Sequence, residues 1–201
     1  MRATQTLPGS YRKKGTMDIS KNEGVMLLLN LIGLVVMVIF GYLFFRAIFW
    51  LNPTAGVHAL QQIQSITGIG WLGVAGVVIL LTVFHIILHE AIHGVFFWVF
   101  TGSRPRFAFR WTYAYASAPD WFIPRNPFLV TTLAPFVLIS LGGLAILGTA
   151  PSGWLLPTWL VMTMNAGGAV GDLAVAIWLV RQPSTCLAQD RGDSVTLFVP
   201  E

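Results

Sequence analysis

Residues 82–100, TVFHIILHEAIHGVFFWVF, combine a strongly apolar composition with four side chains that could bind a metal or transfer a proton. These side chains are His85, His89, Glu90 and His93, and Glu90 is the only one with a formal charge at neutral pH. A charge at the centre of a membrane helix costs roughly 2.5–3.5 kcal/mol on insertion scales. Ionisable groups kept in such a setting usually serve a site, so the stretch indicates a functional centre.

His89, Glu90 and His93 form the pattern H-E-x-x-H. Residues four apart on a helix lie one turn apart on nearly the same face, so both imidazoles can reach one metal ion. Glu90 can then reach a water on that ion and act as its base, so the pattern predicts a zinc site with Glu90 as catalytic residue. The competing interpretation is that the histidines only make hydrogen bonds between membrane helices.

His85 continues the same stripe one turn earlier but lies outside the pattern. We interpret it as a packing residue or as a supporting partner of the metal ligands, and direct metal ligation is the alternative.

A catalytic zinc site usually has three protein ligands, and Asp172 is the carboxylate that lies inside another apolar run. His89 and His93 precede Gly102, the inner end of their run, by 13 and 9 residues, and Asp172 precedes Arg181 by 9. At about 1.5 Å per residue these positions lie about 13–20 Å and about 13 Å from the same side. This depth match predicts Asp172 as the third ligand.

Asn165 precedes Asp172 by seven residues, which would place both on one face of a single helix. We expect Asn165 to support the ligands. Three glycines lie between Asn165 and Asp172, namely Gly167, Gly168 and Gly171. They allow either close helix packing or a helix break around the site.

Four apolar runs cover residues 25–45, 71–100, 128–149 and 159–180, and each reaches the roughly 20 residues that cross a bilayer. The chain is 55% hydrophobic and only 10% charged. It is therefore predicted to be an all-α polytopic membrane protein with about four transmembrane helices, in contact with the lipid bilayer and without a nucleic-acid partner. The single Cys186 excludes an intrachain disulfide framework and a cysteine cluster.

The basic residues predict the orientation in the membrane. Eleven of the twelve Lys and Arg lie in the first 24 residues, in the loop after the second run or at the C-terminal end. The positive-inside rule then places both termini in the cytoplasm. We expect the membrane to be a bacterial plasma membrane. We divide the chain into a disordered N-terminal tail at 1–24, a transmembrane domain with the predicted metal site at 25–181 and a C-terminal tail at 182–201.

Aromatic residues alternate along the loop between the second and third runs, from Phe107 to Tyr115. This period predicts a cytoplasmic strand or short β-hairpin. It could be an edge strand that receives an extended substrate, or an interfacial strand that rests at the lipid headgroups. The strand-like residues 194–199 could pair with this loop. Pro135, inside the third run, should free a carbonyl, kink the helix and open space near the metal.

The segments HEAIHG and NAGGAVGD resemble the site-2 protease type of intramembrane zinc metalloprotease. More closely, residues 70–180 resemble a small bacterial membrane family described as putative zincin peptidases. The resemblance implies His89, His93 and Asp172 as zinc ligands, Glu90 as general base and a loose correspondence of Asn165 to a substrate-orienting asparagine.

The sequence departs from the better-known site-2 proteases at the third ligand. Those proteins carry this Asp in a proline-containing segment that ends Leu-Asp-Gly, whereas here Gly171 precedes Asp172, Leu173 follows it and the segment has no proline.

We therefore expect a zinc metalloprotease that cleaves a membrane protein or peptide. The alternatives are a membrane regulator or transporter that binds zinc without cleavage, and a protease of soluble substrates at the cytoplasmic face.

Overall fold

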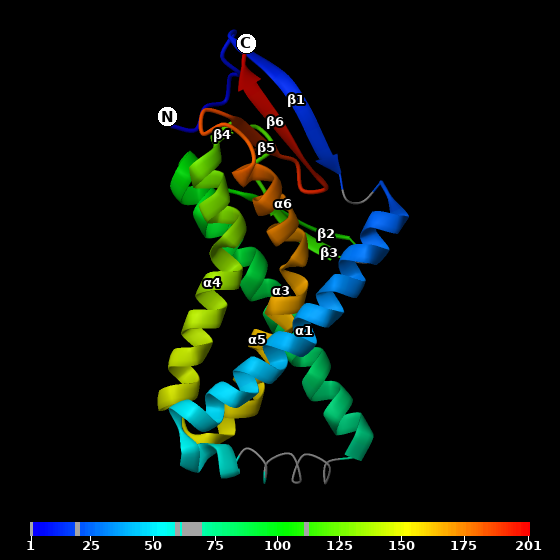
Figure 1. Cartoon of the computed structure of the whole chain (residues 1–201), viewed down its shortest axis with the longest axis vertical. Coiled ribbons are helices and arrows are strands. Elements are labelled where there is room, and N and C mark those ends of the chain that lie inside the picture. The colour runs from blue at the N-terminus through cyan, green and yellow to red at the C-terminus, as the bar shows by residue number, and fades with distance from the viewer. Residues whose placement is uncertain (1, 19–20, 59–60, 62–69, 111–112) are drawn as a thin grey trace. The chain divides into compact units, whose positions relative to one another are not determined.

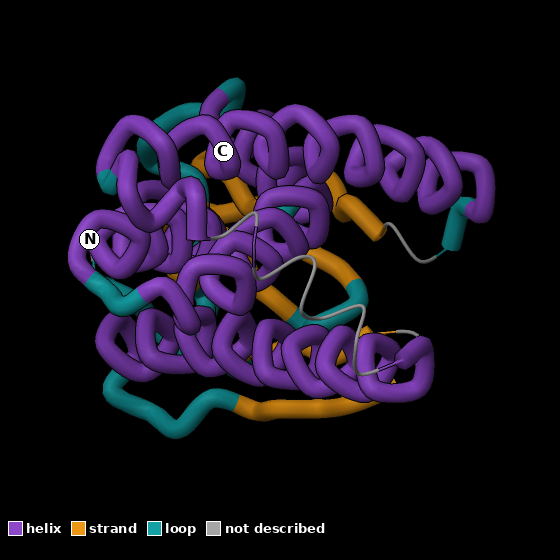
Figure 2. Tube along the Cα trace, turned by 90° about the horizontal axis from the view of Figure 1, so that it is seen from below, coloured by secondary structure: helices purple, strands orange, loops and turns teal. Residues whose placement is uncertain are grey.

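The computed structural model describes residues 2–18, 21–58, 61, 70–110 and 113–201, and most of them are helical (Figure 2). The helices are α1 (Glu23–Leu51), α3 (Gly70–Thr101), α4 (Arg125–Thr149), α5 (Leu155–Gly168) and α6 (Val170–Val180), with a 3-10 turn at Ser152–Trp154. The strands are β1 (Tyr11–Asp18), β2 (Arg106–Arg110), β3 (Tyr113–Ser117), β4 (Ile123–Pro124), β5 (Leu187–Asp190) and β6 (Ser194–Pro200).

Helices α1, α3 and α4 are each long and apolar enough to cross a membrane. The bent pair Ser152–Gly168 and Val170–Val180 passes the same test together, so the described residues contain three candidate spans, or four if the pair counts as one. Leu27, Val35 and Val38 on α1 are each more than half exposed. A surface of this kind suits lipid rather than water, which is consistent with a multi-pass membrane protein.

The fourth apolar run is not one helix. It breaks at Ala169, whose N–H donates to the Asn165 carbonyl at 2.9 Å as helix α5 ends. The low helix propensity of Gly167 and Gly168 favours an end at this point. Asn165 and Asp172 thus belong to different helices, and their seven-residue spacing does not place them on one face. The expectation that they share a face of one helix is wrong for this reason.

The chain divides into two compact units, each with its own hydrophobic core. One unit comprises Leu31–Ile87 and Phe136–Ala169, and its core includes Phe44, Ile48, Leu147 and Met162. The other comprises Met1–Asn30, Leu88–Pro135 and Val170–Glu201. Its core joins helices to strands and includes Phe97, Phe128, Leu179 and Leu197. The division at residues 24 and 181 stays a prediction.

The second of these units holds an antiparallel sheet with the strand order β1-β6-β5-β4. Strand β1, blue in Figure 1, lies beside β6, red, although they come from opposite ends of the sequence. Residues 194–199 lie in strand β6 as expected, but the expectation that they pair with the loop is wrong, because β6 pairs with β1 and β5 and it is β5 that pairs with β4 of the loop. The expectation of a disordered N-terminal tail is wrong, because β6 supplies hydrogen-bond partners for β1 and the core supplies packing for Met17.

The aromatic loop forms a two-stranded hairpin, β2 with β3. Phe107 pairs with Ala116 and Ala108 pairs with Tyr115. Directly paired residues share a face, so Phe107 and Tyr115 point to opposite sides of the hairpin. A single strand would have placed both on one side. Trp111 and Thr112, which belong to the predicted alternation, lie outside the described residues.

Candidate metal centre

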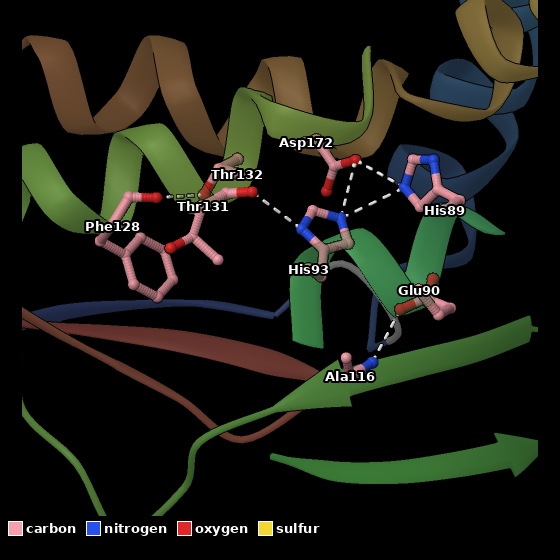
Figure 3. A network of polar contacts seen from close by, with 8 residues as sticks. All are labelled: His89, Glu90, His93, Ala116, Phe128, Thr131, Thr132 and Asp172. Carbon is pink, nitrogen blue, oxygen red and sulfur yellow. Dashed lines mark hydrogen bonds and ion pairs between the residues drawn. The ribbon is translucent and has the colours of Figure 1, made fainter. Parts of the chain in front are cut away.

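Helix α3 presents His89 and His93 from successive turns, and both side chains are buried (Figure 3). Their Nε2 atoms lie 3.2 Å apart. The four-residue spacing makes this approach possible on any regular helix.

Asp172 reaches the two histidines from the first turn of helix α6. Its Oδ2 atom lies 3.1 Å from His89 Nε2 and 3.4 Å from His93 Nε2. Bonds of about 2.1 Å in tetrahedral geometry place the ligand atoms around one zinc ion about 3.4 Å apart. The three donor atoms therefore fit one zinc ion, and two histidines with one carboxylate are a familiar catalytic donor set.

A hydrogen bond at Nδ1 fixes the orientation of the His93 ring. Its Nδ1 atom lies 2.9 Å from the carbonyl oxygen of Thr131 on helix α4. A carbonyl can only accept, so Nδ1 carries the hydrogen and donates it. In the neutral ring Nε2 then presents its lone pair to the donor cluster, which is the arrangement that a metal-binding histidine needs.

Glu90 is held by the hairpin. The Ala116 N–H of β3 donates to Glu90 Oε2 at 2.7 Å. Gly94 allows the close approach of hairpin and helix, since a Cβ atom there would meet the Phe107 ring. The glycine that follows H-E-x-x-H in the sequence was a signal for this contact.

A cavity of about 200 Å³ opens beside these groups. Glu90, His93 and Asp172 line one part of it, and the edge of β3 and the β5–β6 turn line others. The cavity is acidic, because its lining contains four of the chain's eight carboxylates and, among the described residues, no Lys or Arg. The four are Glu90, Asp172, Asp190 and Asp193.

Asp190 lines this cavity, although its position in the C-terminal tail gave no sign in the sequence that it lies near the candidate centre. Its Oδ1 accepts the Gly192 N–H at 2.6 Å within the turn between β5 and β6. Gly192 adopts φ +88° and leaves room for the Tyr115 ring, which a Cβ atom at this position would meet. Burial raises the pKa of Asp190 to about 7, although the Gly192 N–H and His93 favour its charged form.

Two predicted site residues lie outside the donor cluster, which consists of His89, His93 and Asp172. His85 is buried, and a Cβ atom on Gly168 would lie 3.5 Å from its ring. Asn165 is completely buried at the end of α5. Both belong to the other compact unit, so their roles stay predictions.

Comparison with known proteins agrees with this geometry. A family model described as "Putative zincin peptidase" matches residues 82–187, which is more than half of the chain and includes all three donor residues and Glu90. The chain therefore belongs to this family. No curated protein and no solved structure matches it.

Proposed function

We propose that this member of the zincin peptidase family is an intramembrane zinc metalloprotease that hydrolyses membrane-associated proteins or peptides, in the manner of the site-2 protease type. The carrying observation is the convergence of His89, His93 and Asp172 at separations that suit one zinc ion. Glu90, next to His89, lines the cavity beside this cluster. A protein that only binds or transports zinc has no need of a base in this position.

The zinc site, Glu90 and the Ala116 N–H have separate roles in the proposed hydrolysis. Bound zinc would polarise the scissile carbonyl and lower the pKa of a water molecule. Glu90 accepts a proton from the attacking water and delivers it to the leaving amine. The Ala116 N–H holds one carboxylate oxygen of Glu90, which leaves the other to take the proton.

The free edge of β3 is suited to hold an extended substrate. The N–H of Ala116 points away from β2 to Glu90, so in an antiparallel pair the N–H and C=O of Ala114 point to the same outer edge. Ala114 and Ala116 both line the cavity. A substrate helix must unwind before cleavage, and an edge strand would satisfy its freed backbone groups by strand addition.

The sheet also supports the proposed topology. Strands β1, β4, β5 and β6 come from the N-terminal tail, the loop after α3 and the C-terminal tail. Hydrogen-bonded strands of one sheet lie on the same side of a bilayer, and these three segments carry most of the Lys and Arg. The positive-inside rule then favours the cytoplasmic side of the cell membrane. Phe107 and Phe109 are 59% and 76% exposed, which fits a hairpin face at the lipid headgroups.

The test is Glu90→Gln, with Glu23→Gln at an exposed position of α1 as the matched control. Membrane fragments of cells that carry each variant are compared by quantitative proteomics, and a fragment specific to the native protein is then assayed with purified protein. We expect Glu90→Gln to lower cleavage by about 10²–10⁴-fold or more and to keep its metal, because Glu90 is not a member of the donor cluster. Cleavage at the native rate by Glu90→Gln would contradict the proposed function.

A further inference from the structure

Helix α4 contains a proline, Pro135, four residues after Thr131. In a regular helix the N–H of residue 135 would donate to the carbonyl of residue 131. Proline has no N–H, so this hydrogen bond is missing and the Thr131 carbonyl is released. Thr131 is only 1% exposed and Pro135 is completely buried, so water is not available as a substitute partner.

The released carbonyl is taken by His93, whose Nδ1 donates to it at 2.9 Å (Figure 3). The neighbouring hydroxyl groups make their hydrogen bonds within α4. Thr131 Oγ1 donates to the Pro127 carbonyl at 3.0 Å, and Thr132 Oγ1 donates to the Phe128 carbonyl at 2.9 Å. The backbone oxygen of Thr131 is therefore the group that α4 offers to His93.

We propose that Pro135 is a positioning residue of the metal centre, which reserves the Thr131 carbonyl for His93 and so keeps Nε2 of His93 ready for the metal. Prolines in membrane helices are tolerated where a neighbouring group satisfies the freed backbone oxygen. In this protein the satisfying group is one of the three donor residues. The inference rests on the proposed function for its role in cleavage, but its effect on metal binding is measurable without any substrate.

A purely structural role for Pro135 is the competing explanation, since the ring itself could shape the helix beside the cavity. Two variants distinguish these explanations: both remove the Pro135 ring, but only one of them introduces a backbone N–H at position 135. Pro135→Ala introduces an N–H that competes with His93 for the Thr131 carbonyl. Pro135→lactic acid, introduced as a backbone ester, removes the ring but introduces no N–H.

The experiment measures zinc affinity of the purified full-length protein by competition with a chromophoric chelator. Supporting partners of metal ligands typically contribute 10–100-fold in affinity, so we expect Pro135→Ala to bind zinc at least about tenfold more weakly. The lactic acid variant should bind nearly as the native protein does. Pro127→Ala is the control, because Pro127 lies in the first turn of α4, where an N–H has no helical acceptor.

Nitrogen NMR of His93 in the metal-free protein supplies a second readout. The native ring and the lactic acid variant should show protonated Nδ1, and Pro135→Ala should lose this preference. Native zinc affinity in Pro135→Ala would overturn the proposal, and so would equal weakening in both variants, which would assign the effect to the ring. If the alanine variant does not fold, the affinity and the Nδ1 signal of the lactic acid variant decide. Failure of cleavage in the native protein would leave these binding results unchanged, so it would count against the proposed function alone.

Discussion

The acidic cavity allows a strict test of whether Asp172 is a metal ligand or only one of several nearby charges. Asp172, Asp190 and Asp193 all line it, but only Asp172 has an oxygen in the donor cluster with His89 and His93. Each Asp→Asn change keeps the side-chain size, but Asp190 has a pKa of about 7 and is partly protonated at neutral pH, so Asp193→Asn is the matched control for the loss of a negative charge. Charge alone therefore predicts similar effects for Asp172→Asn and Asp193→Asn, whereas ligation predicts one large effect.

The magnitude follows from the number of donors. Four-ligand structural zinc sites bind with roughly 10–16 kcal/mol, or about 2.5–4 kcal/mol per ligand. Asp172→Asn leaves the histidine pair, whose Nε2 atoms lie 3.2 Å apart, but replaces the third donor by a neutral amide. We expect the zinc affinity to fall about 10²–10³-fold, because each 1.4 kcal/mol corresponds to a factor of ten. Asp190→Asn and Asp193→Asn should change it by less than about tenfold.

Chelator competition with the purified variants measures all three affinities in one assay. Native affinity in Asp172→Asn would remove Asp172 from the ligand set and make His85 the next candidate. Comparable losses in all three variants would mean that the separations of 3.1 and 3.4 Å reflect only electrostatic attraction between the carboxylate and the imidazoles.

Three further predictions concern the hairpin, the topology and the Asp190 carboxyl group. Ala114→Pro removes an outward N–H from β3 and should lower cleavage about tenfold or more with normal zinc content, whereas Ala114→Val should not; equal cleavage by both would leave the hairpin as an interfacial anchor. In a cysteine-free background, cysteines at Ser10 and Ser103 should resist labelling from outside intact cells and one at Thr54 should react; outside labelling at Ser103 would contradict the topology. Asp190 has a pKa of about 7 in the folded protein, against an ordinary value of 3.8. Between these pH values the folded protein keeps a proton on Asp190 that the unfolded chain has lost. The metal-free protein should therefore lose stability as pH rises from about 4 to 7. Denaturation of native protein and Asp190→Asn at both ends of this range measures the difference, and identical pH slopes would show that Asp190 is not protonated in this way.

Much of the candidate metal centre could be predicted from the sequence, because it depends on local periodicity. The spacing of His89 and His93 places two imidazoles on one helix face whatever the surroundings. Depth counting along apolar runs brought Asp172 to the same level, since the length of a membrane helix limits where its residues can lie. The missing N–H of Pro135 is a covalent property, so a freed carbonyl was predictable, but its partner was not.

The remaining features depend on contacts between segments that are distant in the sequence. The hairpin register decides that Tyr115 faces away from Phe107, and a shift of one residue would reverse every side chain. The N-terminal tail is a strand only because β6 offers its backbone groups to it. His93 meets the Thr131 carbonyl, and Asp190 enters the cavity, only after helices and strands have packed. Local sequence determined which groups could do chemistry, and tertiary packing decided which partners hold them, because hydrogen bonds across a fold carry no sequence period.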